Sequence, residues 1–136
     1  MKKYIPFLLA FSIILAACAS ESTSLTGKWD LVSYGPTESL TAALPDSDAS
    51  LTFAEDGTVS GSGGCNSLGG NYTVDGNAIS FSDLTMTLMA CDGALMEQEG
   101  AVTQVLSGTA QFEIKDGTLT IMNNGIELVL TAVPAE

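Results

Sequence analysis

The chain has 136 residues, with 16 acidic residues against four lysines, no arginine and no histidine, and therefore a net charge of −12. Nucleic-acid affinity depends on clustered Lys and Arg that neutralise phosphates, and this chain has too few bases to form such a cluster. The same shortage excludes a basic patch that would hold the protein on anionic lipid.

The N-terminus has the features of an export signal. Lys2 and Lys3 form a short positive region, and an apolar run over residues 5–17 leads directly to Cys18. This run is shorter than the roughly 20 residues of a membrane-spanning helix, and Pro6 lies near its start. We therefore expect residues 1–17 to be a signal peptide.

The sequence "LAAC" at residues 15–18 resembles a bacterial lipobox, in which the cysteine is acylated and becomes the first mature residue. An ordinary cleavage site beside an incidental cysteine is the alternative. Because two or three acyl chains anchor a protein stably, we expect a membrane-tethered, extracytoplasmic protein, on the outer membrane if the host has two. Cys18 is the expected lipidation site, and residues 18–24 are the expected tether. Cleavage would leave two lysines against 16 acids, a net charge of −14.

From Leu25 onward, apolar residues alternate with polar ones, which is the pattern of half-buried β-strands. We expect one domain over residues 25–132. The alternating positions are Trp29 and Leu31, Leu51 and Phe53, Tyr72 and Val74, Ile79 and Phe81, Phe112 and Ile114, Leu119 and Ile121, and Ile126, Leu128 and Leu130.

Four dipeptides separate several of these runs, and each favours a type I′ hairpin turn. They are Asp56-Gly57, Asp75-Gly76, Asp116-Gly117 and Asn124-Gly125. The sequence therefore predicts a mostly β protein built as an antiparallel meander.

Residues 94–108 break the alternation. Apolar residues at helical spacing, Leu95, Val102, Val105 and Leu106, share one side, with Glu97, Gln98 and Gln104 mostly elsewhere. Asp92 is placed to cap the N-terminus and Gly108 to end the helix. We predict one α-helix packed against a curved sheet. Residues 35–50, with Pro36 and Pro45, are expected to form a long loop across one end of the sheet.

The glycine-rich stretch "GSGGCNSLGGNYTVDG" at residues 61–76 contains Cys65 and Asn66. It is not a phosphate-binding loop, because no lysine lies near and a strand follows. Zinc is disfavoured because the chain has no histidine and Cys65 lies 26 residues from Cys91. We expect no metal and no cofactor. Asn66 either hydrogen-bonds local backbone at a bend or points outward to bind a ligand.

With Cys18 assigned to lipid, Cys65 and Cys91 remain as an even pair in an oxidising compartment. A disulfide is then the default expectation. The alternative is a reactive cysteine, with Cys91 activated by the start of the predicted helix.

Residues 56–76, together with "TLMAC" at 87–91, "MEQE" at 96–99 and the opening "LTGKWDLVSY" at 25–34, resemble the META domain family. The resemblance covers nearly all of the mature chain. Its strongest part is Gly64-Cys65-Asn66, then Gly70 and Tyr72, and downstream Met89-Ala90-Cys91. Leu68 and Leu88 depart from the pattern, since members often carry an aromatic and a basic residue there.

The resemblance implies an open antiparallel β half-barrel with one helix, and a role in the cell envelope or its stress response. It supplies no enzymatic activity. It also singles out Gly64, Asn66, Gly70, Tyr72 and Met89 as motif residues and possible binding residues.

Three hypotheses about function follow. The first is a lipid-anchored, non-catalytic envelope module that binds a protein partner. The second is a carrier of an apolar or cationic small molecule, held on the concave face of the half-barrel. The third, which we disfavour, is a hydrolase that uses a cysteine or carboxylates. Its candidate pairs, Asp46 with Asp48 and Glu55 with Asp56, have the character of loop and turn residues, and calcium at Asp46 and Asp48 is equally weak.

Overall fold

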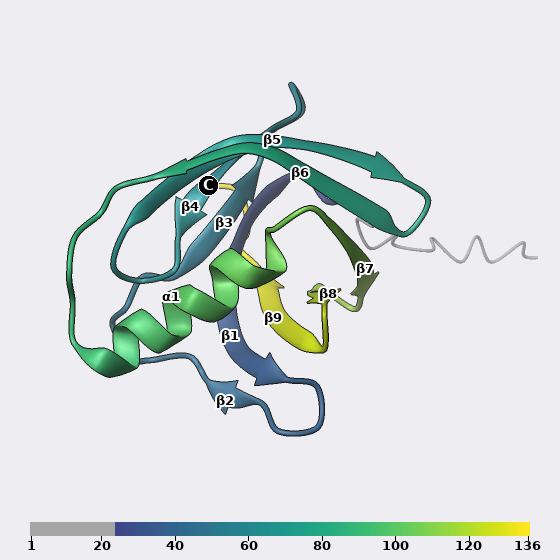
Figure 1. The fold of residues 1–136 in the computed structure, drawn as a ribbon. Coiled ribbons are helices and arrows are strands. Elements are labelled where there is room, and N and C mark those ends of the chain that lie inside the picture. Colours follow the sequence, from purple (N-terminus) through teal and green to yellow (C-terminus); the bar gives the residue numbers. More distant parts are fainter. Residues whose placement is uncertain (1–23) are drawn as a thin grey trace, which may run out of the picture.

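In residues 24–136, the part of the chain that this computed structural model describes, nine antiparallel strands form one sheet and one helix packs at its end (Figure 1). The predicted signal peptide and Cys18 lie outside the described residues. The elements are β1 (Gly27–Pro36), β2 (Thr41–Ala42), β3 (Ser50–Phe53), β4 (Thr58–Ser62), β5 (Ser67–Asp75), β6 (Ala78–Met86), α1 (Gly93–Val105), β7 (Thr109–Lys115), β8 (Thr118–Asn123) and β9 (Ile126–Ala132).

Eight of these strands close into a barrel. The order runs from β1 through β3 to β9 in sequence, and β9 pairs back with β1 from Trp29↔Ala132 to Pro36↔Ile126. The expected open half-barrel is therefore wrong, although the mostly β, antiparallel class with one helix is confirmed. β1 closes the barrel because its first residues pair with β3 while most of its length, with a bulge between Leu31 and Ser33, pairs with β9.

The four predicted turns all connect neighbouring strands, but only two have the predicted geometry. The dipeptides at 116–117 and 124–125 have positive φ at both residues, from 50° to 77°, as a type I′ turn requires. In the other two turns the glycine alone has positive φ, 86° at Gly57 and 60° at Gly76. Gly57 closes a longer loop in which its N–H donates to Ala54 O, so a two-residue turn does not form there.

The alternating apolar residues fill the inside of the barrel, which is the hydrophobic core of the protein. Each such side chain contributes about 1.5–3 kcal/mol when fully buried. The concave face that we considered for a small ligand is therefore occupied by packed side chains. Those exposed by 2% or less include Leu51, Phe53, Val59, Ile79, Leu119, Ile121, Leu128 and Leu130.

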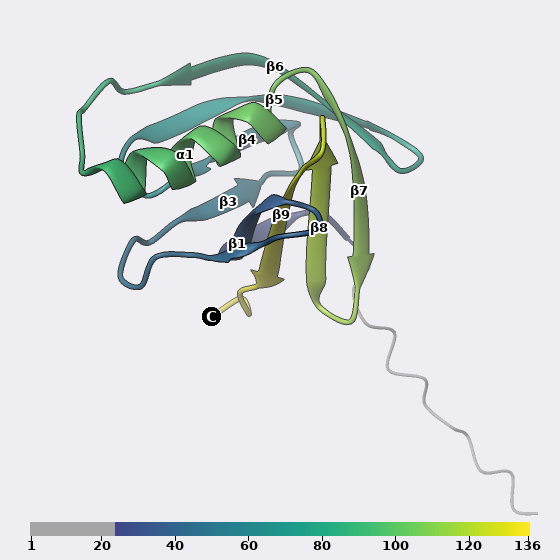
Figure 2. The same cartoon turned by 60° about the horizontal axis from the view of Figure 1, so that its bottom comes forward.

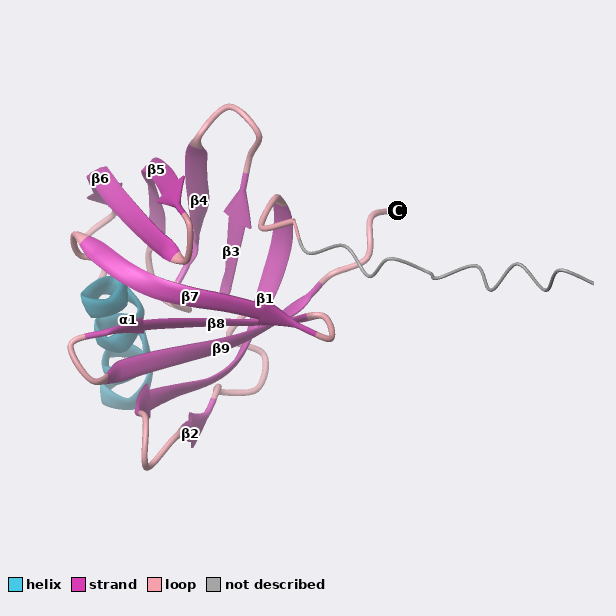
Figure 3. Cartoon of the chain, turned by 90° about the vertical axis from the view of Figure 1, so that its right-hand side faces the viewer, coloured by secondary structure: helices cyan, strands magenta, loops and turns pink. Residues whose placement is uncertain are grey.

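Helix α1 begins as predicted, because the Asp92 side chain accepts a hydrogen bond from the Leu95 N–H at 3.1 Å. It ends at Val105, three residues before Gly108, whose φ is +77°. α1 lies across one end of the barrel, and the C-terminus lies at the other (Figures 2 and 3). No helix within residues 24–136 is long and apolar enough to cross a bilayer.

The predicted long loop at residues 35–50 is wrong in part. β1 continues to Pro36, and the short strand β2 folds back to pair with it at Ser33↔Ala42 and Tyr34↔Thr41. Residues 43–49 then form a loop that contacts α1, through hydrogen bonds of Leu44 and Ser47 with Gln98.

Candidate functional site

A disulfide joins two segments at the α1 end of the barrel. The Cys65 and Cys91 sulfurs are 2.03 Å apart, with their Cα atoms 6.1 Å apart. The bond links the glycine turn, residues 62–66, to the segment 87–91 that leads into α1. The predicted disulfide is confirmed. In this state neither sulfur is a free thiol, so the reactive-cysteine alternative has no nucleophile.

Glu99 of α1 holds the glycine turn against the helix. Its side chain is only 3% exposed. The carboxylate accepts hydrogen bonds from the backbone N–H of Cys65 at 3.1 Å, the backbone N–H of Asn66 at 2.5 Å and the Asn66 side-chain amide at 2.6 Å. Hydrogen bonds to an ionised acceptor are stronger than neutral ones, so this carboxylate fixes the turn.

Asn66 in turn holds the segment 87–91. Its Oδ1 accepts from the Met89 N–H at 2.6 Å, and its Nδ2 donates to Met89 O at 3.1 Å. The Thr87 hydroxyl also donates to Oδ1, at 2.9 Å. Asn66 is 2% exposed, so it does not point outward, and the backbone that its side chain binds is not local to the bend but lies 23 residues away at Met89.

Gln98, fully buried beside Glu99, ties the helix to two further segments. Its Nε2 donates to Gly63 O at 2.8 Å and to Ser47 Oγ at 3.2 Å, and its Oε1 accepts from the Leu44 N–H at 2.7 Å. The placement of Gln98 away from the buried side of the helix was therefore wrong. Every polar group of this side chain has a partner, which is why its burial is tolerated.

Gly64 is needed where α1 meets the glycine turn. A Cβ at this position would lie 2.7 Å from Leu95 Cδ1 and 2.9 Å from Gln98 Nε2. Its φ is +117°, which side chains rarely allow. The position therefore supports close packing of the helix.

Gly70 and Tyr72 also belong to the framework. A Cβ at Gly70 would lie 2.8 Å from Leu84 Cδ2, because β5 and β6 are out of register there by one residue. The Tyr72 hydroxyl donates to Ala54 O at 2.7 Å, and its ring meets Phe53 edge to face at 5.1 Å.

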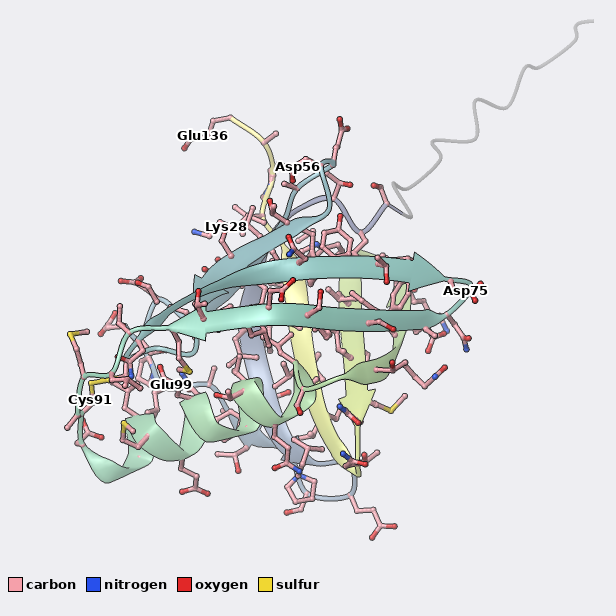
Figure 4. The ribbon with its side chains drawn as sticks, turned by 45° about the horizontal axis from the view of Figure 1, so that its top comes forward. Lys28, Asp56, Asp75, Cys91, Glu99 and Glu136 are labelled. Atoms are coloured by element: carbon pink, nitrogen blue, oxygen red, sulfur yellow. A yellow bond between two sulfur atoms is a disulfide. The ribbon has the colours of Figure 1, made fainter. Side chains whose placement is uncertain are left out.

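Met89 differs from these residues because its backbone is fixed while its side chain is 57% exposed. It borders a mostly apolar cleft of about 360 Å³ between residues 86–90 and α1. Leu88, at the cleft mouth, is 94% exposed, and Met96 is 41% exposed. Sulfur atoms gather around Cys91 and Glu99 in Figure 4. The lining residues are Asn66, Met86, Leu88, Met89, Ala90, Met96, Glu99, Gly100 and Thr103.

Sequence reasoning missed Glu99 as a buried anchor and Leu88 as an exposed apolar residue. The spacing held a signal for Glu99, because Leu95, Glu99 and Val102 follow one another by four and three residues and so share a helix face. Nothing in the local pattern marks Leu88, whose neighbours on both sides are mixed in polarity.

Of the acidic pairs in the hydrolase hypothesis, Asp46 and Asp48 line one polar cavity of about 290 Å³ together with Lys28 and Asp30. Asp46 and Asp48 are exposed loop residues with φ of 59° and 51°. Asp56 accepts from the Thr58 hydroxyl at 2.7 Å and its N–H at 3.0 Å, and these hydrogen bonds lower the pKa of the carboxyl. Within residues 24–136 no three Cys, Asp or Glu side chains are grouped as metal ligands.

The fold is shared with several solved structures. A protein from Burkholderia xenovorans, solved by NMR, is 24% identical with a TM-score of 0.64, over 80% of this chain and 83% of that one. A DUF4847 family protein from Bacteroides vulgatus is 15% identical with a TM-score of 0.56, over 82% and 95% of the two chains. A Bacteroides eggerthii protein is 17% identical with a TM-score of 0.54, over 81% and 100%. At these identities the likeness concerns the fold alone.

No curated protein matches the sequence. The family comparison is more informative, because the META domain matches residues 23–135. This range includes the glycine turn, the disulfide, the segment 87–91 and α1. By this match over most of its length, the chain belongs to the META domain family.

Proposed function

We propose that the protein is a lipid-anchored, non-catalytic binding module of the cell envelope, which meets a protein partner at the cleft between residues 86–90 and α1. The lipid is attached at Cys18, and the folded domain acts outside the cytoplasm. In a host with two membranes it sits on the outer one.

The observation that carries this proposal is the contrast between backbone and side chains at residues 87–89. The backbone is fixed by Asn66, by the disulfide at Cys91 and by the hydrogen bond from Thr87 N–H to Ser67 O at 3.0 Å. The side chains of Leu88 and Met89 nevertheless point largely into solvent.

A fixed backbone under exposed apolar side chains favours binding. Single exposed apolar residues are ordinary on protein surfaces, but here Leu88, Met89 and Met96 gather around one cleft. Because the backbone is already ordered, a partner that covers these side chains loses less conformational entropy on binding. Methionine side chains adapt to the shape of what they contact.

The position of the N-terminal end of the folded domain fits a tethered module. Ser24, where the described chain begins, lines one cavity together with Gly117 and Ala135, near the C-terminus. This is the end of the barrel opposite α1 (Figure 3). A tether that leaves from Ser24 would direct the cleft away from the membrane.

Photo-crosslinking in intact cells tests the partner. A photoreactive amino acid at position 88 is expected to give a discrete protein adduct. The matched control is position 74, because Val74 is also apolar and exposed, by 46%, but lies near the β5–β6 turn. Adducts of equal yield at both positions, or none at position 88, contradict the proposal.

The anchor has its own test. A palmitate analogue is expected to label the wild-type protein and to leave Cys18→Ser unlabelled. Label that persists in Cys18→Ser, or a wild type without label, contradicts lipidation at this residue.

An apolar or cationic small molecule is the second candidate ligand. The cleft volume of about 360 Å³ lies within the range of small-molecule sites, its lining is mostly apolar, and the net charge of −12 attracts cations. Calorimetry with lipids and cationic amphiphiles should then show binding that Leu88→Ser weakens and Val74→Ser does not. A flat trace with all of them rejects this candidate.

A further inference from the structure

One edge of β6 has no strand beside it over its last residues. β6 pairs with β5 almost throughout, down to Leu68↔Met86. On its other side it pairs with β7 only at Ala78, Ile79 and Ser80. Within residues 24–136, no strand pairs with that side of residues 84–86. An unpaired strand edge is a template for another extended chain.

The hydrogen-bond pattern identifies the groups that this edge presents. The Phe81 N–H donates toward β7, to Gly108 O at 2.8 Å, whereas the Thr87 N–H donates to Ser67 O on the β5 side. Between Phe81 and Thr87 the strand is irregular: Asp83 has a φ of +53°, and the register with β5 shifts there. Because backbone groups alternate along a strand, Leu84 and Met86 direct their N–H and C=O groups to the open edge.

An apolar groove runs beside this edge. A cavity of about 100 Å³ lies between β6 and α1, with Leu68, Leu84 and Leu106 among its lining residues. Met86 and Thr103 line both this cavity and the larger cleft, so the two lie next to each other. Strand addition uses backbone hydrogen bonds at an edge and pockets that receive alternate side chains, and both are present here.

Charge decides between possible occupants. The lysines of residues 24–136 are Lys28 and Lys115, and neither lines the groove or the cleft. Figure 4 shows Lys28 well away from Cys91 and Glu99. Acidic residues are exposed on the two elements that border the groove, Asp83 on β6 and Asp92 at the start of α1. A second copy, itself at −12, would be repelled, whereas a basic segment would be attracted.

We propose that the open edge of β6 at residues 84–86 and the facing side of α1 accept an extended segment of a partner protein, in which basic and apolar residues alternate, by β-strand addition. This inference rests on the proposed function, because it uses the same cleft, and it specifies the class of partner. Apolar side chains of the segment enter the groove, and its basic side chains face the surrounding acids.

The probe is a synthetic heptapeptide of alternating lysine and valine, added to the disulfide-bonded, isotope-labelled protein. Without peptide, the amide protons of Leu84 and Met86 should exchange faster than those of Thr85 and Thr87. With peptide, exchange at Leu84 and Met86 should slow by about tenfold or more. Unchanged exchange at both residues overturns the proposal.

Three control peptides give strand addition a distinct signature. In an added strand, alternate backbone N–H groups face β6 and the others face away from it. N-methylation of the nitrogens that face β6 should abolish the protection, whereas N-methylation of those that face away should preserve it. Glutamate in place of lysine should also abolish it. Equal protection with both methylated peptides would mean apolar contact without strand pairing, and would overturn the proposal.

A protein variant separates this inference from the proposed function. Met86→Lys should remove the protection, because it places a positive charge at the groove, and Val74→Lys should leave it unchanged. If the crosslink from position 88 forms in cells but the peptide protects neither Leu84 nor Met86, partner binding stands and strand addition is wrong. If the peptide protects both residues but no crosslink forms, strand addition stands and the proposed envelope partner fails.

Discussion

The two ends of the barrel are held together by different chemistry. At the end with the turns at Gly57 and Gly117, neighbouring strands pair through short hairpins over an apolar interior. At the α1 end, buried polar side chains and a disulfide join segments distant in sequence. Asn66 and Glu99 are 33 residues apart, and Leu44 and Gln98 are 54 apart. The hairpins at the first end therefore form between strands that are neighbours in sequence, whereas the cleft depends on a few long-range polar bonds.

The largest expected effect tests the barrel side of this contrast. Phe53 is completely buried, and Phe53→Ala should lower the free energy of unfolding by about 3–5 kcal/mol. Denaturant unfolding measures it, and probes at both ends should report one transition. Phe112→Ala is the matched control, since Phe112 is only partly buried, and it should cost less. Equal losses would mean that burial in the barrel does not dominate its stability.

The disulfide should rank next, and its loss should affect the two ends unequally. Replacing Cys65 and Cys91 together by serine removes a constraint on 26 residues, worth about 3.5 kcal/mol in the chain-entropy description. Hydrogen exchange should accelerate more in residues 87–91 than in β8 or β9. Uniform acceleration across the chain would show that the α1 end does not open independently.

The Glu99 anchor should follow. Glu99→Gln places an amide N–H₂ against backbone donors, and we expect a loss of about 1–3 kcal/mol. Glu97→Gln makes the same chemical change at an exposed neighbour on α1, and should stay within about 0.5 kcal/mol of wild type. Chemical denaturation compares the two variants. An equal cost for both would mean that the buried hydrogen bonds are unimportant.

The smallest expected effect on stability concerns Asp56, in the turn between β3 and β4. Hydrogen bonds from Thr58 lower the pKa of Asp56 below 3.8, the value for an unperturbed side chain. The carboxylate therefore stabilises the fold above that pH, and the contribution is lost as pH falls through the lower folded value. Melting temperatures of wild type and Asp56→Ala should differ slightly at neutral pH and converge in strong acid. A difference that grows in acid would have the wrong sign.

The features that could be predicted from the sequence are mostly local ones, and those that could not be predicted depend on contacts between distant segments. Seven of the nine strands were predictable because apolar and polar residues alternate along them, whereas β2 and β4 were not predicted. The positions of the turns were predictable from their Asx-Gly dipeptides, although only those at 116–117 and 124–125 have the predicted type I′ geometry. Closure was not predictable, because it depends on β1 and β9, the first and last strands, pairing across the whole chain.

The site was harder to predict than the fold. The disulfide was accessible by counting cysteines. Gln98 and Glu99, however, look like solvent-facing helix residues until their partners at Gly63, Cys65 and Asn66 are known. A buried polar side chain is tolerated only because of those partners, and one sequence does not show which segments meet.

Barrel closure through β1 and β9 also constrains how the protein is made. Trp29 pairs with Ala132, so the first strand lacks one neighbour until β9 has been synthesised. A chain that emerges with its N-terminus first must keep that edge unpaired meanwhile, and such edges invite aggregation. Loss of β9 would therefore do more than remove one strand: it would leave most of the first strand permanently without its second partner.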